Sequence, residues 1–458
     1  MLYYVVSRPR PPKIVLIMVS VHPSFDGLSA DVLACIIAEL PFSDICSLRL
    51  VSQTLALRSY QPFATHLTTK TLKWTSTQQL QEFVHFTQPN QPGCLLQHLT
   101  LVGVAASSIL EHVSDSDVLF ATSTKLLTNA FTNLRLNSGR GALKSVVLQV
   151  QGEDDNGSTI PFEKIRDYRS TWKAVWETAA QTFELTSCAL AESALSIQKL
   201  DVFGSVARCS LACDRIGNRD LSKSLEKLKS LTLSLSHSLA EDPQGDAIPK
   251  AHADKITQLL HLCPQLENLE LHWYNLRYYK ENDDPEEQQF FTHVVKGAQL
   301  SQLQRCRLDG IDTSETVLLA FLGKATRLSY LCINDMDLKP GSFRPVFNYL
   351  TNHVQHLDHL QLDRLDEGKL ICFDGPGEPH LPSGSPNGPN TLTRTGKDCQ
   401  RHIGYRPMFG RTKGSGEAWT WHEEHSILYG PPDVVLSYLI QIPRIMIDNS
   451  DTDSDNED

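Results

Sequence analysis

The side chains best placed to do chemistry belong to the run His422-Glu423-Glu424-His425. Two imidazoles with carboxylates between them indicate a metal site or a hydrolase centre. In the His-Glu-x-x-His helix of zinc proteases, however, the histidines stand four residues apart so that both rings face the ion. Here they stand three apart, which favours a surface polar segment. A hydrolase that uses His422 and His425 is one of three functional hypotheses.

Other signatures of catalysis are missing from the sequence. It contains no glycine-rich phosphate loop, no nucleophile elbow and no Cys-x-x-Cys pair. Cys209 and Cys213 are four residues apart, but no second Cys or His pair completes a set of zinc ligands. The eleven cysteines show no paired spacing and several stand in apolar runs, which indicates buried thiols in a reducing compartment. We therefore expect a non-enzyme without cofactor or metal.

Composition narrows the class of protein. Of 458 residues, 41% are hydrophobic and 21% are charged, which is typical of a folded chain long enough for two domains or a repeat array. A net charge of −11 argues against nucleic acid as a partner, because phosphate contacts need clustered Lys and Arg. The apolar run Ile14–Val19 is too short to span a membrane. It is also a poor signal peptide, so we interpret 1–26 as a disordered leader and expect a protein of the cytoplasm, the nucleus or both.

The clearest internal signal is a Leu-x-x-Leu-x-Leu pattern, whose last two apolar positions alternate as in a strand. It recurs eight times, and its copies begin at Leu96, Leu143, Ile197, Leu228, Leu266, Leu303, Leu328 and Leu357. Segments with helical periodicity lie between the copies; examples are 170–194, 251–262, 285–296, 313–324 and 342–352. Strands that alternate with helices predict a mixed α/β fold.

This alternation is similar to leucine-rich repeats of the irregular kind, which implies a stacked β–α solenoid over 90–367. The usual Asn ladder is missing, since only Asn275 and Asn334 stand near the expected place. An α/β sheet domain with Leu-rich strands is therefore the alternative. Beyond the repeats we expect a flexible Gly/Pro-rich loop at 368–416, an apolar capping segment at 417–443 and an acidic disordered tail at 444–458.

Residues 27–66 predict a short helical module. Leu33, Ile36, Ile37 and Leu40 form one apolar helical stripe, and Pro41 ends that helix. The pair Ser43-Asp44 offers a cap for a second helix. A unit this small cannot bury all of its apolar side chains alone, so it must pack on the rest of the chain or on a partner.

The order of residues in this module resembles the F-box, the segment that docks a Skp-family adaptor. The matching positions, which the resemblance implies are adaptor contacts, are Leu28, Val32, Leu33, Ile36, Leu40, Pro41, Asp44, Ile45, Leu48, Arg49, Leu50, Val51 and Ser52. The family usually begins Leu-Pro, whereas this chain has Leu28-Ser29. We expect the missing proline to weaken that edge of the docking surface. Arg49 is either a polar rim contact or an ion-pair partner of Asp44.

The resemblance implies a substrate-receptor subunit of a Skp–cullin–F-box ubiquitin ligase. The module would bind the adaptor, and through it a cullin, while the repeat domain holds a target protein; no nucleic acid or membrane is expected as a partner. The alternative is a non-catalytic interaction scaffold in which the module is only a helical cap of the repeats. A Leu33→Asp, Ile36→Asp double variant that still binds the adaptor would contradict the docking assignment.

Overall fold

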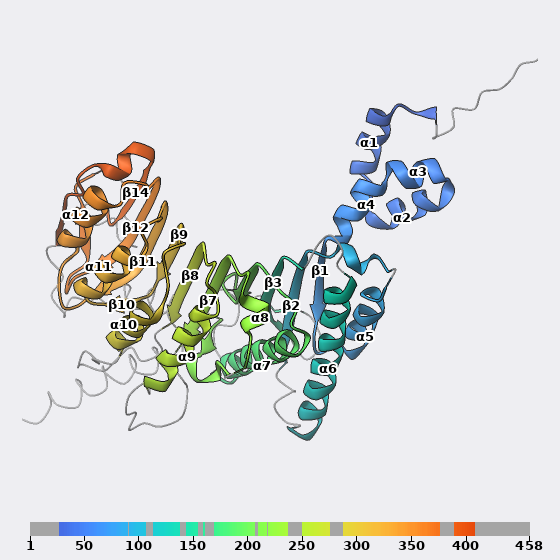
Figure 1. Ribbon diagram of the computed structural model, residues 1–458, viewed down its shortest axis with the longest axis horizontal. Helices are drawn as coiled ribbons and strands as arrows, with labels where there is room; N and C mark the ends of the chain where they lie inside the picture. Colours follow the sequence, from blue (N-terminus) through green and yellow to red (C-terminus); the bar gives the residue numbers. More distant parts are fainter. Residues whose placement is uncertain are drawn as a thin grey trace, which may run out of the picture. The chain divides into compact units, whose positions relative to one another are not determined.

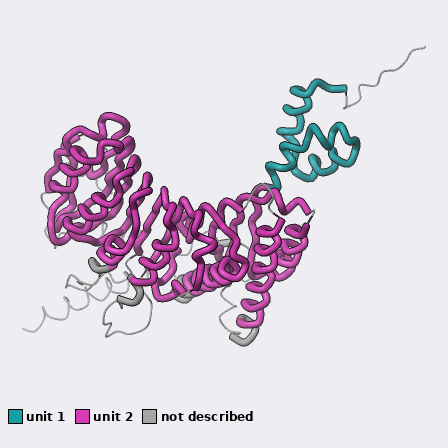
Figure 2. Tube along the Cα trace, in the orientation of Figure 1, with its two compact units in different colours: residues 1–67 teal, residues 68–458 magenta. Residues whose placement is uncertain are grey.

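The computed structural model describes residues 27–89, 91–106, 113–137, 143–153, 159–160, 169–206, 209–217, 219–236, 250–274, 287–375 and 389–407. The chain divides into two compact units, residues 1–67 and residues 68–458 (Figure 2). The leader, the segment with His422 and His425, the expected capping segment and the acidic tail lie outside the described residues.

Unit 1 is helical. Its helices are α1 (Ala30–Ala38), α2 (Phe42–Val51), α3 (Gln53–Arg58) and α4 (Tyr60–Leu67). They surround a small core of four fully buried side chains, Leu33, Ile37, Ile45 and Leu55.

Unit 2 is a mixed α/β structure with a mostly parallel sheet. Nine parallel strands follow one another in chain order: β1 (Thr69–Lys73), β2 (His98–Ala106), β3 (Ser145–Glu153), β5 (Lys199–Val202), β7 (Ser230–Ser236), β8 (Asn268–Tyr274), β9 (Arg305–Asp309), β11 (Tyr330–Leu338) and β12 (His359–Asp366). The short strands β4 (Thr159–Ile160), β6 (Leu211–Ala212) and β10 (Asp312–Thr313) pair with β3, β7 and β11.

The helices that join these strands lie along one side of the sheet (Figure 1). They are α5 (Thr77–Phe86), α6 (Val113–Asn137), α7 (Arg169–Ser193), α8 (Ser222–Leu225), α9 (Lys250–His261), α10 (Glu287–Gly297), α11 (Glu315–Lys324) and α12 (Phe343–His353). Neighbours in this layer contact one another, as α5 does α6 and α11 does α12. The helices lie on one side because each strand–helix–strand crossover has the same handedness. The five helices expected from periodicity are confirmed, with ends shifted by one or two residues.

The repeated Leu pattern explains why the sheet forms. The central positions of all eight copies are paired neighbours in the register, from Leu99 and Val146 through Leu269 and Cys306 to Leu360. The last positions form a second such row, two residues along each strand. Both rows are buried beneath the helices, at 3% exposure or less. The eight predicted strands are therefore confirmed, and the shared register accounts for a common pattern despite unequal spacing.

The helix layer lies close to the sheet at Gly103 of β2. A Cβ atom there would overlap Thr182 Oγ1 and Thr178 Cγ2 of α7. Trp74 Nε1, just past β1, donates a hydrogen bond of 2.8 Å to the same Thr182 hydroxyl. Glycine is thus required at this position because helix and strand meet without room for a side chain.

Both ends of the sheet differ from the sequence-based expectation. The sheet begins at β1, before residue 90, and β14 (Thr391–Thr395) pairs antiparallel with β12 inside the segment expected to be a loop. The same segment holds the 3-10 helix η6 (Gly396–Gln400) and a small second sheet of β13 (Ile371–Phe373) and β15 (Tyr405–Pro407). The loop assignment for 368–416 is therefore wrong in its described parts. The cause is that β12 would otherwise expose its backbone donors and acceptors, and β14 pairs with them.

Candidate functional site

The first helix of unit 1 follows Ser29, the position where this chain lacks the proline usual in the F-box pattern. Ser29 is the N-cap of α1, and its hydroxyl accepts a hydrogen bond of 3.4 Å from Val32 N. A serine in this position satisfies a backbone donor that the helix leaves unpaired. The start of α1 is thus capped without the proline. The effect of the missing proline on adaptor docking stays a prediction.

The second helix begins before the Ser43-Asp44 pair that the sequence offers as its cap. Helix α2 begins at Phe42 with Pro41 as its N-cap, so Ser43 and Asp44 lie within its first turn and do not cap it. Asp44 still favours the helix, because a carboxylate interacts well with the N-terminal end of the macrodipole. Ser52 caps α3 by accepting a hydrogen bond of 3.1 Å from Leu55 N.

The expected adaptor contacts fall into three classes by burial. Leu33 and Ile45 are each only 1% exposed and belong to the core of unit 1, so neither side chain is open to a partner in this structure. Half-buried positions are Leu28, Ile36, Leu40, Leu48, Arg49 and Ser52. Exposed positions are Val32, Pro41, Asp44, Leu50 and Val51. The motif therefore includes large aliphatic residues both in the core of unit 1 and on its surface.

Arg49 has an internal role in unit 1. Its Nη1 donates a hydrogen bond of 2.7 Å to the Ala56 carbonyl, and its guanidinium lies 4.1 Å from the centre of the Phe63 ring. The Tyr60 ring lies on the same cation at 5.9 Å. Arg49 therefore links α2 to α3 and α4. This role differs from both alternatives expected from the sequence, a polar rim contact and an ion pair with Asp44.

Unit 1 exposes large apolar side chains. Leu50 is 89% exposed, Leu57 78% and Val51 72%, and Val32, Phe42 and Tyr60 are also open to solvent. Only two other large apolar residues of the described chain are as exposed, Val118 and Leu136 of α6. Sequence reasoning missed Phe42, Leu57 and Tyr60. The available signal was an apolar residue at positions where helical periodicity predicts a solvent-facing polar one.

The face of the sheet opposite the helices is polar. Side chains alternate along each strand, so the residues between the buried Leu rows point to this face. Its first row, in register order, is His98, Ser145, Lys199, Ser230, Asn268, Arg305, Tyr330 and His359. The Leu rows lie beneath the helices, whereas this face is not covered by them.

Several groups on this face are held by their neighbours. Arg307 Nη2 and Asp309 Oδ2 form an ion pair of 3.0 Å between β9 positions two residues apart. His272 is buried, which lowers its pKa, and its Nδ1 lies 3.3 Å from Ser234 Oγ. Near the far ends of β11 and β12, the Arg364 guanidinium pairs with Asp335. Burial is the main cause that raises the pKa of Asp335 to about 8.

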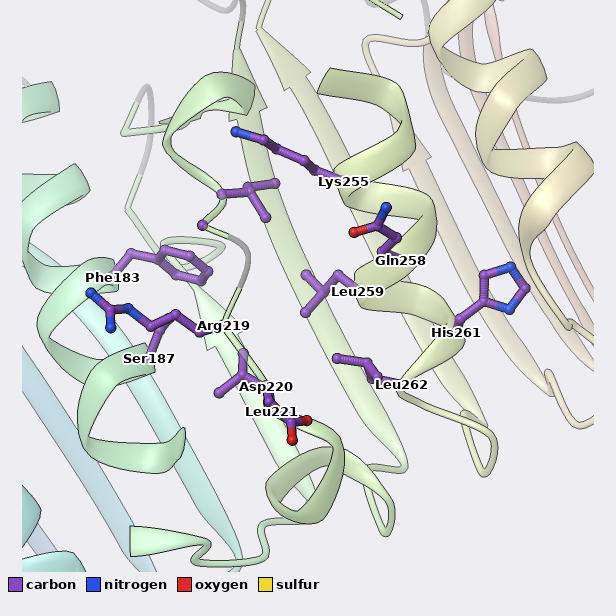
Figure 3. A pocket seen from close by; sticks show the side chains of 12 residues that line it. Phe183, Ser187, Arg219, Asp220, Leu221, Lys255, Gln258, Leu259, His261 and Leu262 are labelled. Atoms are coloured by element: carbon purple, nitrogen blue, oxygen red, sulfur yellow. The ribbon is translucent and has the colours of Figure 1, made fainter. Parts of the chain in front are cut away.

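A cavity of about 420 Å³ lies on the helical side of the sheet, between α7, α9 and the loop before α8 (Figure 3). It exists because α8 is a single turn and leaves a gap in the helix layer. Its apolar wall is already covered, since Phe183 and Leu259 are each 4% exposed. Lys255 donates to a backbone carbonyl at 3.0 Å, and Arg219 pairs with Glu184 at 3.5 Å. The cavity is a gap in packing, and the long cationic side chains of Lys255 and Arg219 at its wall are already bonded.

The two cysteines that stand four residues apart in the sequence, Cys209 and Cys213, lie in the interior of unit 2. Burial raises the pKa of both thiols far above neutral pH. It therefore disfavours the thiolate at both positions, the form that acts as a ligand or a nucleophile. No group of His, Cys, Asp and Glu in the described ranges has the geometry of a metal site. His422 and His425 lie outside those ranges.

Comparison with protein-family models gives no match for this chain, and comparison with curated proteins gives none either. Within the part of the chain that the structure describes, no helix has the length and apolarity needed to cross a bilayer.

Proposed function

We propose that the protein is a substrate-receptor subunit of a Skp–cullin–F-box ubiquitin ligase. Unit 1 would dock the adaptor, and the polar sheet face of unit 2 would hold a target protein. The observation that carries the proposal is the concentration of exposed apolar side chains in unit 1. Six of the eight exposed large apolar residues in the described chain belong to its four short helices. A soluble protein gains from such exposure only where a partner covers it.

The architecture of unit 2 supports the same assignment. Nine strands in chain order, an in-register row of Leu positions and helices along one side are the features of an irregular leucine-rich-repeat-like solenoid. We interpret unit 2 as such a solenoid, in which the unequal repeats arise from helices of different length. Its open polar face can vary in sequence without loss of the core, as a recognition surface requires. The protein itself would supply no bond chemistry, since holding a target near a ubiquitin-carrying enzyme works by proximity.

Copurification of the full chain with the Skp-family adaptor tests docking. The Leu33→Asp, Ile36→Asp variant is unsuitable, because Leu33 is a core residue and its loss would unfold unit 1. The better variant is Leu50→Asp, Leu57→Asp, which changes two exposed side chains. Its matched control is Val118→Asp, Leu136→Asp, since these residues of α6 are similarly exposed, at 68% and 69%.

We expect the unit 1 variant to lose most adaptor binding and the α6 variant to retain it. Equal binding by parent and both variants would refute the docking surface. Reconstituted ubiquitin transfer then separates a receptor from a scaffold. A scaffold would bind the adaptor without supporting transfer to any captured target.

A further inference from the structure

Three side chains on the polar sheet face form a continuous stack, which we call the Arg305 stack. Arg305, Tyr330 and His359 occupy paired positions on the adjacent strands β9, β11 and β12. The Arg305 guanidinium carbon lies 4.1 Å from the centre of the Tyr330 ring. The Tyr330 and His359 rings are parallel, with centres 4.5 Å apart and planes inclined by 3°.

The stack holds an exposed cation in a fixed orientation. Arg305 is exposed, whereas Tyr330 and His359 are half-buried beside it. A guanidinium held over an aromatic ring can still offer N–H donors to a bidentate acceptor. Little side-chain entropy is then lost when an anion binds, because the stack already restricts the Arg305 rotamers.

The acids near Arg305 do not neutralise it. The Glu267 carbonyl accepts a hydrogen bond from Arg305 N. The Glu267 carboxylate, however, forms an ion pair of 2.7 Å with Lys229. Arg307, on the next row of the same face, is paired with Asp309 on the row after that. Among the ion pairs within the described ranges, none joins Arg305 to a carboxylate. The stack therefore presents a cation that has no ion-pair partner among the described residues, on an otherwise polar face.

A single carboxylate fits this charge better than a phosphate. Glu270 is exposed one row along the sheet from Arg305, and Asp309 follows on the next row. Both acids would repel a dianion more strongly than a monoanion. A carboxylate also matches the planar fork of a guanidinium with two parallel hydrogen bonds.

We propose that the Arg305 stack binds an Asp or Glu side chain of the target protein. The inference rests on the proposed receptor function and adds the chemical class of the group that unit 2 recognises. Asn268 on the same row and Gln361 on the next row of this face supply neutral hydrogen-bonding groups around the carboxylate.

The test uses the full chain immobilised without the adaptor, and three pools of short synthetic peptides. The pools share random flanks and differ only at the central residue, which is Glu, Gln or phosphoserine. We expect about tenfold more capture of the Glu pool than of the Gln pool, the size of effect that one charge-assisted hydrogen-bond pair gives. Arg305→Gln should abolish the preference, and Tyr330→Ala should reduce it.

Arg327→Gln is the matched control, because Arg327 is also exposed but its Nη1 is bonded to Gln302 Oε1 at 2.7 Å. This variant should keep the Glu preference of the parent. Equal capture of Glu and Gln pools, stronger capture of the phosphoserine pool, or a preference that survives Arg305→Gln would each overturn the inference. Adaptor binding through unit 1 is measured separately, so the two proposals fail independently.

Discussion

The buried core of unit 1 is small enough that one truncation should unfold it. Four side chains, Leu33, Ile37, Ile45 and Leu55, are each 1% exposed and form the whole of its fully buried cluster. A Leu→Ala change in a packed core costs about 2–5 kcal/mol. A helical module of this size holds at most about 3–5 kcal/mol of net stability. Leu33→Ala should therefore leave unit 1 largely unfolded, whereas Leu50→Ala, at a side chain 89% exposed, should change stability by less than about 0.5 kcal/mol.

Amide hydrogen exchange measures this prediction separately in the two units. In Leu33→Ala, protection should be lost in peptides from 27–67 and kept in peptides from the Leu rows of the sheet, because the division into two compact units predicts independent opening. Leu50→Ala should exchange like the parent throughout. The reasoning would be refuted if Leu33→Ala kept full protection in 27–67, or if both variants lost it to the same extent.

Three further predictions concern unit 2 and the thiols. Gly103→Ala should destabilise unit 2 by about 1–3 kcal/mol in chemical denaturation, because the added Cβ overlaps threonine side chains of α7. Burial, with the nearby charge of Asp337, raises the pKa of Asp366 to about 6, so the folded state holds this proton longer than the unfolded state does. Melting temperatures should show the parent losing stability relative to Asp366→Asn as pH rises from about 4 to 6, with a constant difference above that range. Native alkylation followed by mass spectrometry should modify the exposed Cys35 and Cys94 and leave the eight buried cysteines unmodified.

The sheet could be predicted from the sequence because its register repeats one physical requirement. Every copy of the Leu pattern places two side chains under the helices. A residue such as Leu269 or Leu331 therefore marks a strand whatever the length of the helix before it. The edges carry no such requirement. Strand β1 has a single buried side chain, Leu72, and β14 has only Leu392. An edge strand is specified by the backbone it pairs with, which a pattern of apolar residues does not record.

The candidate site in unit 1 was predictable as a region but not residue by residue. A resemblance marks positions such as Leu33 and Leu50 alike, although one is buried and the other is exposed. Distinguishing them requires the crossing of four short helices, which depends on tertiary contacts such as Arg49 on Phe63. The Arg305 stack was invisible for a related reason, since its three residues come from separate repeats and meet only when the register is known.

The two surfaces differ in chemistry in a way that matches the two roles proposed for them. Exposed aliphatic side chains such as Leu50 and Leu57 gain free energy in proportion to the area that a partner covers, and they bind without strict geometry. A contact of that kind suits a constant subunit. A polar face with a fixed cation, as at Arg305, gains little from contact area and discriminates by the position of the acceptor. Selection among targets therefore belongs on the sheet and assembly on the helical module, so exchanging Arg305 should change which target is captured while leaving adaptor binding unchanged.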